Sequence, residues 1–200
     1  MKLKLYVFLV INLMTANLLK AQNNYIEEIN QYRDSLNKAF AHPETSILKA
    51  EYLTTFKELP YFPVNEKYRI KAKFIRIKNG KTFEMLTSTS RKPVYTVYGK
   101  LVFKIDDKTY ELYLYKPKDP KPGYENWLFC PFTDLTNGEE TYGGGRYLDF
   151  TTTDMKNPVI DFNMCYNPYC AYNDKYSCPV PPKENFLNLR IEAGVKKLHD

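Results

Sequence analysis

The sequence predicts a mainly β protein of the α+β class: an antiparallel β-sandwich or partly closed β-barrel with an N-terminal helical arm. A helical pattern of apolar residues is confined to residues 25–56, runs of alternating apolar and polar residues follow after residue 67, and Asn, Asp and Gly doublets separate several of these runs. A sandwich or a barrel is the natural way to bury many strands that are each apolar on one face.

The first 21 residues have the pattern of a secretory signal peptide. Lys2 and Lys4 precede an apolar run over residues 5–19, and Ala21 ends the segment. The run is shorter than the roughly 20 apolar residues of a transmembrane helix, although an uncleaved anchor is the alternative. We therefore expect cleavage after Ala21, a single domain at residues 22–200, and export to the periplasm or the extracellular space with no membrane span after cleavage.

Charge and composition exclude several classes of function. The full chain has a formal charge of +6, and Lys2, Lys4 and Lys20 contribute three of these charges, which leaves +3 for the exported part. Nucleic-acid binding needs clustered Lys and Arg, so we expect no nucleic acid as partner. The two histidines, His42 and His199, lie far from the four cysteines, and no nucleotide-binding glycine motif is present. We expect no metal and no cofactor.

The N-terminal arm is predicted to be helical. Apolar residues recur at three- and four-residue steps from Tyr25 to Phe40, Asn23 or Asn24 can cap the start, and His42-Pro43 ends the pattern. A second short helix is predicted from Ser46 to about Phe56.

The remaining elements are predicted to be strands. A strand begins at Tyr68, and the change of apolar parity at Phe74-Ile75 predicts a β-bulge. Asn79-Gly80 predicts a hairpin turn with a returning strand at Lys81–Ser88. Asp106-Asp107 predicts a second hairpin. Further strands are predicted at Val94–Ile105, Thr109–Tyr115, Asn126–Phe132, Val159–Phe162 and Leu187–Val195.

Two stretches are too particular to be generic loops. They are TNGEETYGGGRYLDF at 136–150 and DFNMCYNPYCAYNDKYSCPVPPKEN at 161–185. Together with FKELPYFPVNEKYRIKAKF at 56–74 and IEAGVK at 191–196, they resemble the domain-of-unknown-function family 1684. The resemblance implies no particular reaction. It places Cys170 and Cys178 at characteristic positions of the family, whereas Cys165 departs from the pattern.

The candidate binding residues come from the two unusual stretches, because loops on a rigid β scaffold often carry function. They are Tyr142, Arg146, Asp149, Asp161 and Asn163. We expect Arg146 to form a charge-assisted bond with Asp161 or Asp149, with Tyr142 and Asn163 nearby. The alternative is that Asp and Asn side chains only hold irregular backbone together. Likewise, Gly143–Gly145 is either a tight turn or an anion-binding loop.

The leading functional hypothesis is an exported cell-envelope binding or structural module with a polar pocket built from these loops. An unidentified small molecule or glycan would stack on tyrosines 142, 147, 166, 169, 172 and 176, unless these rings merely cover the core. The alternative is a carboxylate-dependent hydrolase acting on an envelope or glycan substrate. Its candidate carboxylates are Asp134, Glu139, Glu140, Asp149 and Asp161.

Cysteine pairing is the last expectation. An oxidising compartment permits disulfides, and four cysteines allow three complete pairings. We expect Cys170 and Cys178 to form a disulfide, since Asn173-Asp174 lets the intervening chain turn back. Buried thiols are the alternative, and the pairing of Cys130 and Cys165 stays open.

Overall fold

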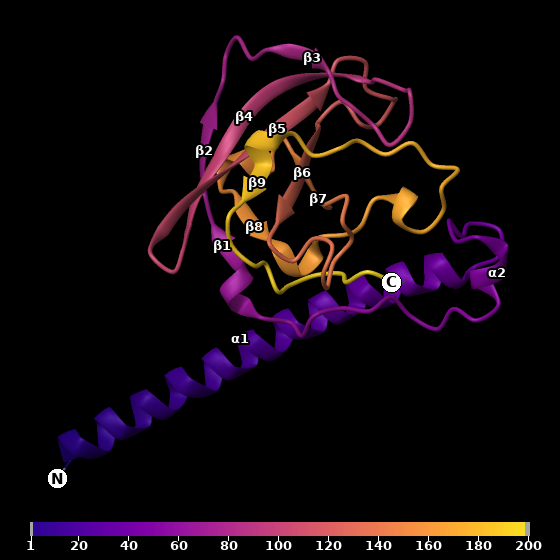
Figure 1. Ribbon diagram of the computed structural model, residues 1–200. Helices are drawn as coiled ribbons and strands as arrows, with labels where there is room; N and C mark the ends of the chain where they lie inside the picture. The colour runs from indigo at the N-terminus through magenta and orange to yellow at the C-terminus, as the bar shows by residue number, and fades with distance from the viewer. Residues whose placement is uncertain (1, 199–200) are drawn as a thin grey trace.

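The computed structural model describes the backbone of residues 2–198 and the side chains of residues 22–198. Two antiparallel sheets stand above one long N-terminal helix, and the C-terminal segment runs between the sheets and that helix (Figure 1). The mainly β prediction with a helical arm is therefore confirmed, and the sheets do not close into a barrel. The predicted signal peptide, residues 1–21, lies outside the residues whose side chains are described.

Helix α1 spans Lys2–Ala41 and helix α2 spans Ala50–Leu53. On α1, the predicted apolar face is confirmed by the buried side chains of Tyr25, Ile29 and Phe40. Helix α2 is one turn, much shorter than predicted, because an isolated helix of the predicted length is itself only marginally stable in water. Within the described part of the chain, no helix is both long and apolar enough to cross a membrane.

The larger sheet has the strand order β2-β4-β5-β6-β7, with β3 and β9 added at β4 and β6. All pairs are antiparallel except β6 with β9. A small second sheet pairs β1 with β8. The strands are β1 (Arg69–Lys71), β2 (Lys73–Arg76), β3 (Thr82–Glu84), β4 (Val94–Ile105), β5 (Lys108–Pro117), β6 (Trp127–Asp134), β7 (Arg146–Thr151), β8 (Val159–Asp161) and β9 (Phe186–Leu187).

The β4–β5 hairpin is confirmed. Asp106 and Asp107 both have positive φ, 48° and 62°, the left-handed conformation that a two-residue hairpin turn requires. Asp tolerates this conformation better than most residues do.

The Asn79-Gly80 hairpin is wrong. Strands β2 and β3 both pair with β4, one after the other along the same edge, and do not pair with each other. Gly80 is needed for close approach, since a Cβ atom there would lie 1.8 Å from the carbonyl oxygen of Val97. The predicted bulge at Phe74-Ile75 is also wrong: β2 runs through both residues, and the chain changes sheet two residues before Phe74, at Ala72.

Both faces of the larger sheet are buried. Leu101, Phe103 and Leu112 pack in the main core, whereas Tyr95 and Phe129 pack in a second core on the other face. The register of β4 shifts at Val97/Gly99, and this one-residue shift moves the odd-numbered residues from one core to the other. A third cluster, which includes Phe40 and Tyr172, joins α1 to the C-terminal loops.

The predicted last strand, Leu187–Val195, is wrong beyond Leu187, and β7 was missed. Ile191, Ala193 and Val195 are buried as their alternation suggested, but among the described residues their β pairing is limited to an isolated bridge between Val195 and Tyr61. Several of these carbonyls instead accept hydrogen bonds from a buried arginine of β7, described next.

Candidate functional site

The structure separates the five predicted site residues into four places. Arg146 lies in the core, Asp161 and Asn163 lie against α1, Tyr142 contacts Cys170, and Asp149 lines a cavity. The predicted bond from Arg146 to Asp161 or Asp149 is wrong.

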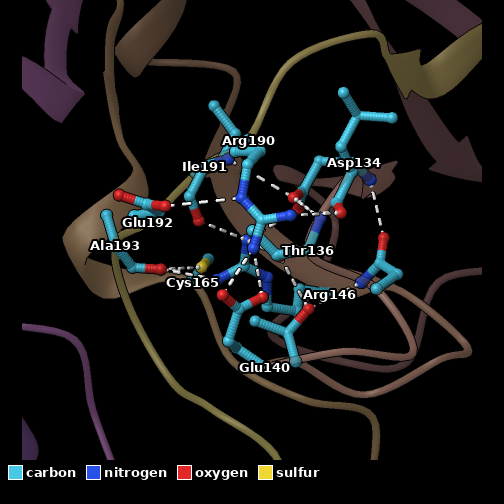
Figure 2. Close-up of polar contacts among 12 residues, drawn as sticks. Asp134, Thr136, Glu140, Arg146, Cys165, Arg190, Ile191, Glu192 and Ala193 are labelled. Atoms are coloured by element: carbon cyan, nitrogen blue, oxygen red, sulfur yellow. Dashed lines mark hydrogen bonds and ion pairs between the residues drawn. The ribbon is translucent and has the colours of Figure 1, made fainter.

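Arg146 is the centre of a fully buried polar cluster (Figure 2). Its Nη2 donates to Asp134 Oδ2 at 2.7 Å, and neither side chain is exposed. The same guanidinium donates to the carbonyl oxygens of Ala193 at 2.5 Å and Ile191 at 2.9 Å. Asp134 Oδ1 in turn accepts the backbone N–H groups of Thr136 at 2.8 Å and Ile191 at 3.3 Å.

This cluster explains the irregular C-terminal segment. A buried carbonyl needs a donor, and Arg146 supplies donors from one planar group to alternate residues of the segment. The segment therefore needs no neighbouring strand. Arg146 belongs to the framework of the protein, because its contacts join β6, β7 and the C-terminal segment and leave no side-chain surface for a ligand.

The acidic side chains shortly before Arg146 form ion pairs with a second arginine, Arg190 (Figure 2). Arg190 pairs with Glu139 at 2.8 Å and with both carboxylate oxygens of Glu140. These carboxylates and Asp134 are thus held by guanidinium groups. Among the described residues, no group of three or more His, Cys, Asp or Glu side chains is arranged to hold a metal ion.

Asp161 and Asn163 attach α1 to the body of the protein. The Tyr25 hydroxyl lies 3.0 and 2.9 Å from the two Asp161 oxygens, and Asn163 Nδ2 donates to that hydroxyl at 2.9 Å. Asn163 also makes a reciprocal pair of 2.9 Å bonds with the backbone of Asn65. Burial, followed by the charge of Asp161, raises the pKa of Tyr25, which keeps the hydroxyl protonated. The structural alternative is confirmed for this pair.

The glycine tract is a turn that carries Tyr142. Gly145 has a φ of 89°, and a Cβ atom on Gly144 would lie 2.4 Å from the ring of Tyr142. The ring therefore lies over the glycine backbone, and its hydroxyl reaches Cys170 Sγ at 3.8 Å. Cys170 and Cys178 are neighbours but are present as free thiols, so the disulfide stays a prediction.

Asp149 is the predicted site residue that lies at a cavity. The cavity holds about 290 Å³ and lies between α1 and the tyrosine-rich C-terminal loops. Its lining is mainly aromatic and aliphatic. The lining residues are Tyr32, Leu36, Ala39, Phe40, Thr45, Ile47, Leu59, Tyr61, Asp149, Tyr166, Asn167, Tyr169, Tyr172 and Val195.

The Asp149 carboxylate is oriented by a neighbouring tyrosine. The Tyr166 hydroxyl donates to Asp149 Oδ2 at 2.7 Å. Although Asp149 as a whole is exposed, protein atoms crowd its carboxyl group, and this loss of solvent raises its pKa above the ordinary value. Tyr166 and Trp127 act in the opposite direction through hydrogen bonds to the charged form.

Two buried polar atoms of the lining have no hydrogen-bond partner among the described residues. They are the hydroxyl of Tyr61 and Oδ1 of Asn167. Asn167 Nδ2 donates to the Lys196 carbonyl at 2.9 Å, which fixes the orientation of the amide because a carbonyl can only accept. Asn167 therefore offers the cavity an acceptor, and buried polar atoms without partners are uncommon in proteins.

Comparison with known proteins identifies the family. A family model described as "Protein of unknown function (DUF1684)" matches residues 54–196. The chain belongs to the DUF1684 family. The solution NMR structure of an uncharacterized protein from Haloarcula marismortui is similar, with a TM-score of 0.68 and 27% sequence identity over 88% of this chain and 96% of that chain. No curated protein matches the sequence.

The DUF1684 match covers one side of the cavity and not the other. Tyr61, Asp149 and Asn167 lie inside the matched residues, whereas Tyr32 and the rest of α1 precede them. The apolar pattern over Tyr25–Phe40 predicted a buried helix face, and the tyrosines of the C-terminal stretches are crowded in sequence, but no local pattern shows that these two regions meet. The tyrosine cluster itself was the signal that could have located the cavity.

Proposed function

We propose that this DUF1684 protein is an exported cell-envelope binding module whose cavity between α1 and the C-terminal loops holds one neutral sugar ring of a glycan. The observation that carries the proposal is the pair of buried atoms without partners, Tyr61 Oη and Asn167 Oδ1, in an aromatic cavity.

The polar groups of the cavity favour a ligand that donates hydrogen bonds. Asn167 Oδ1 can only accept, the Asp149 carboxylate accepts when charged, and the Tyr61 hydroxyl does either. An anionic ligand would meet the charge of Asp149 and find no donor for Asn167. The nearby guanidinium of Arg33 lies 4.5 Å over the Tyr61 ring and is not part of the cavity lining. Sugar hydroxyls donate and accept, which suits all three groups.

The remaining lining favours a small ring. Tyrosine rings provide flat apolar surface with a polar edge, the surface on which the C–H face of a sugar packs. A volume of about 290 Å³ lies at the lower end of ligand pockets, which run from roughly 300 to 1,000 Å³, and it suits a single ring.

Binding is favoured over hydrolysis. Glycoside hydrolysis uses two carboxyl groups about 5–10 Å apart on either side of the scissile bond. Among the described residues that line the cavity, Asp149 is the only carboxylate. The other carboxylates of the hydrolase hypothesis are engaged by Arg146, Arg190 and Tyr25.

Tyr61→Phe tests the binding proposal directly. The variant removes a hydroxyl that has no protein partner among the described residues, so stability should be unchanged or slightly higher. Affinity for the best ligand in a panel of neutral mono- and disaccharides should fall about tenfold in calorimetry, the value of one hydrogen bond. Tyr124→Phe, an exposed tyrosine outside the cavity, is the matched control.

Two results would reject the binding proposal. One is that no sugar of the panel binds with a Kd below about 1 mM. The other is that Tyr61→Phe lowers stability and leaves sugar affinity unchanged, which would make the hydroxyl a structural group.

Export is the second part of the proposal and rests on the charged, apolar and small segments at the start of the chain. N-terminal sequencing of the exported protein should begin at Gln22, and recovery of intact Met1 in the cytosol would contradict export. Export would also place Cys170 and Cys178 where a disulfide is stable.

A further inference from the structure

We propose that Cys170 and Cys178 are a thiol–disulfide exchange site, in which Cys170 attacks a small-molecule disulfide and Cys178 resolves the mixed disulfide. The inference rests on the proposed export, which would place both cysteines in a compartment where disulfides are stable. It does not depend on what the cavity binds.

The two thiols are held together by the backbone between them. The Cys170 N–H group donates to Cys178 Sγ at 3.1 Å. The intervening chain turns back at Asn173, whose N–H group bonds to the Tyr169 carbonyl at 3.0 Å. Cys178 is also fixed from outside this loop, because its N–H group donates to Ser88 Oγ at 3.1 Å. The Cys178 sulfur is therefore held against the backbone of Cys170.

The pair is asymmetric in exposure. Cys170 is partly exposed, whereas Cys178 is only 8% exposed. A dissolved disulfide therefore meets Cys170 first, and Cys178 lies behind it within reach of the product. This is the arrangement of an attacking and a resolving thiol.

The surroundings of Cys170 favour its thiolate. The Cys178 thiol, the Tyr142 hydroxyl and the Ser88 hydroxyl donate hydrogen bonds that lower the pKa of Cys170 to about 6, against the opposing effect of burial. The pKa of Cys178 is raised, first by its bond to Cys170 and then by burial. At neutral pH the pair thus carries one negative charge, mainly on Cys170.

The reaction balances without a further reagent. Cys170 S⁻ attacks one sulfur of a disulfide RSSR, the S–S bond breaks, and RS⁻ leaves and takes a proton from water. Cys178 then gives its proton to water and attacks Cys170 Sγ, which expels the second RS⁻, and this RS⁻ takes up a proton from water. Two protein thiols are oxidised to one disulfide, and RSSR is reduced to two RSH.

Oxidised glutathione is the probe for the test. The purified protein, reduced and freed of reductant, is treated with it, and the four cysteines are followed by peptide mass spectrometry. Wild type should form the Cys170–Cys178 disulfide without a lasting adduct. Cys178→Ser should accumulate one glutathione on Cys170. Cys178 in the Cys170→Ser variant should react at most about one-tenth as fast as Cys170 does in Cys178→Ser. Cys130 and Cys165, both buried, are internal controls.

The pH profile separates an exchange site from a chance neighbour. Alkylation of Cys170 by iodoacetamide in wild type should be half-maximal near pH 6, and Tyr142→Phe should move this midpoint upward. If a cysteine variant fails to fold, the alkylation midpoint of the wild-type protein still tests whether Cys170 is an exchange thiol. Sugar affinity is measured in parallel. A negative result for thiol exchange therefore leaves the sugar-binding proposal intact, and a negative result for sugar binding leaves the exchange site intact.

Three results would overturn the exchange site. Cys178 could react before Cys170, Cys170 could show the alkylation midpoint of an ordinary thiol near pH 8.5, or the disulfide, once formed, could resist excess reduced glutathione. The last result would identify a structural disulfide.

Discussion

The Arg146 cluster and the aromatic cavity both use residues of the unusual stretch at 136–150, yet they satisfy their carboxylates in different ways. In the cluster, the Asp134 carboxylate is satisfied by Arg146 and two backbone N–H groups, with no exposure of either side chain. In the cavity, Tyr61 and Asn167 keep buried polar atoms without partners among the described residues. The buried Nε of Arg146 also lacks a partner among the described residues. However, Arg146 and Asp134 have no exposed side-chain surface, whereas Tyr61 and Asn167 line a cavity of about 290 Å³, and this difference indicates which region maintains the fold and which is open to a ligand.

The same contrast separates two kinds of carboxylate. Asp134 is removed from water and held by a charged arginine, whereas Asp149 has only the neutral partners Tyr166 and Trp127 among the described residues and remains exposed at the cavity. Loss of the first should therefore cost stability, and loss of the second should change mainly pH dependence and binding.

The largest effect is expected from Asp134→Ala. The change leaves the Arg146 charge buried without its carboxylate, and breaking a buried pair on one side costs about 3–5 kcal/mol. Glu139→Ala, which removes an exposed partner of Arg190, should cost at most about 1 kcal/mol. Urea unfolding of both variants measures the comparison. Equal losses would show that burial does not distinguish the two ion pairs.

A smaller loss is expected from Tyr25→Phe. The hydroxyl joins α1 to the Asp161 carboxylate and to Asn163, and a hydrogen bond to a charged group contributes about 1.5–3 kcal/mol. The free energy of unfolding should fall by that amount, while Tyr124→Phe should leave it unchanged. A Tyr25→Phe protein as stable as wild type would mean that α1 is held by apolar contacts alone.

The smallest effect concerns Asp149 and pH. Its pKa is raised in the folded protein, so the folded state binds the proton more tightly than the unfolded chain does. This contribution favours folding at low pH and is lost as pH rises from about 4 through the folded pKa. The melting temperature of wild type relative to Asp149→Asn should therefore fall slightly between pH 4 and pH 7. Asp119→Asn, at an exposed position, should show no such trend. If the melting temperature of wild type relative to Asp149→Asn rose with pH, the pKa of Asp149 would be lowered in the folded protein.

Local patterns predicted the elements that depend on neighbours in sequence. The spacing of apolar residues predicted the buried face of α1, and Asp106-Asp107 predicted the β4–β5 turn, since both follow from backbone geometry within a few residues. Asn79-Gly80 has an equally good turn signal, but β4 offers one long edge to both β2 and β3, and the turn signal cannot reveal that edge.

The site depended on contacts that the sequence does not display. Arg146 looked available for a ligand, and only the folded chain brings it to Asp134 and the carbonyls of Ile191 and Ala193. The alternation in that last segment correctly marked buried side chains. It suggested a strand because nothing in the sequence says that an arginine will satisfy the backbone.

The central claim is that ligands bind at the aromatic cavity and that the Arg146 cluster is framework. Titration of isotope-labelled protein with its best neutral sugar, followed by amide chemical shifts, tests this most directly. The account predicts concentration-dependent shifts at Tyr61, Asn167 and Tyr169, with Arg146 and Ile191 unmoved. Shifts centred on Arg146 and Ile191, with the cavity amides unmoved, would contradict it.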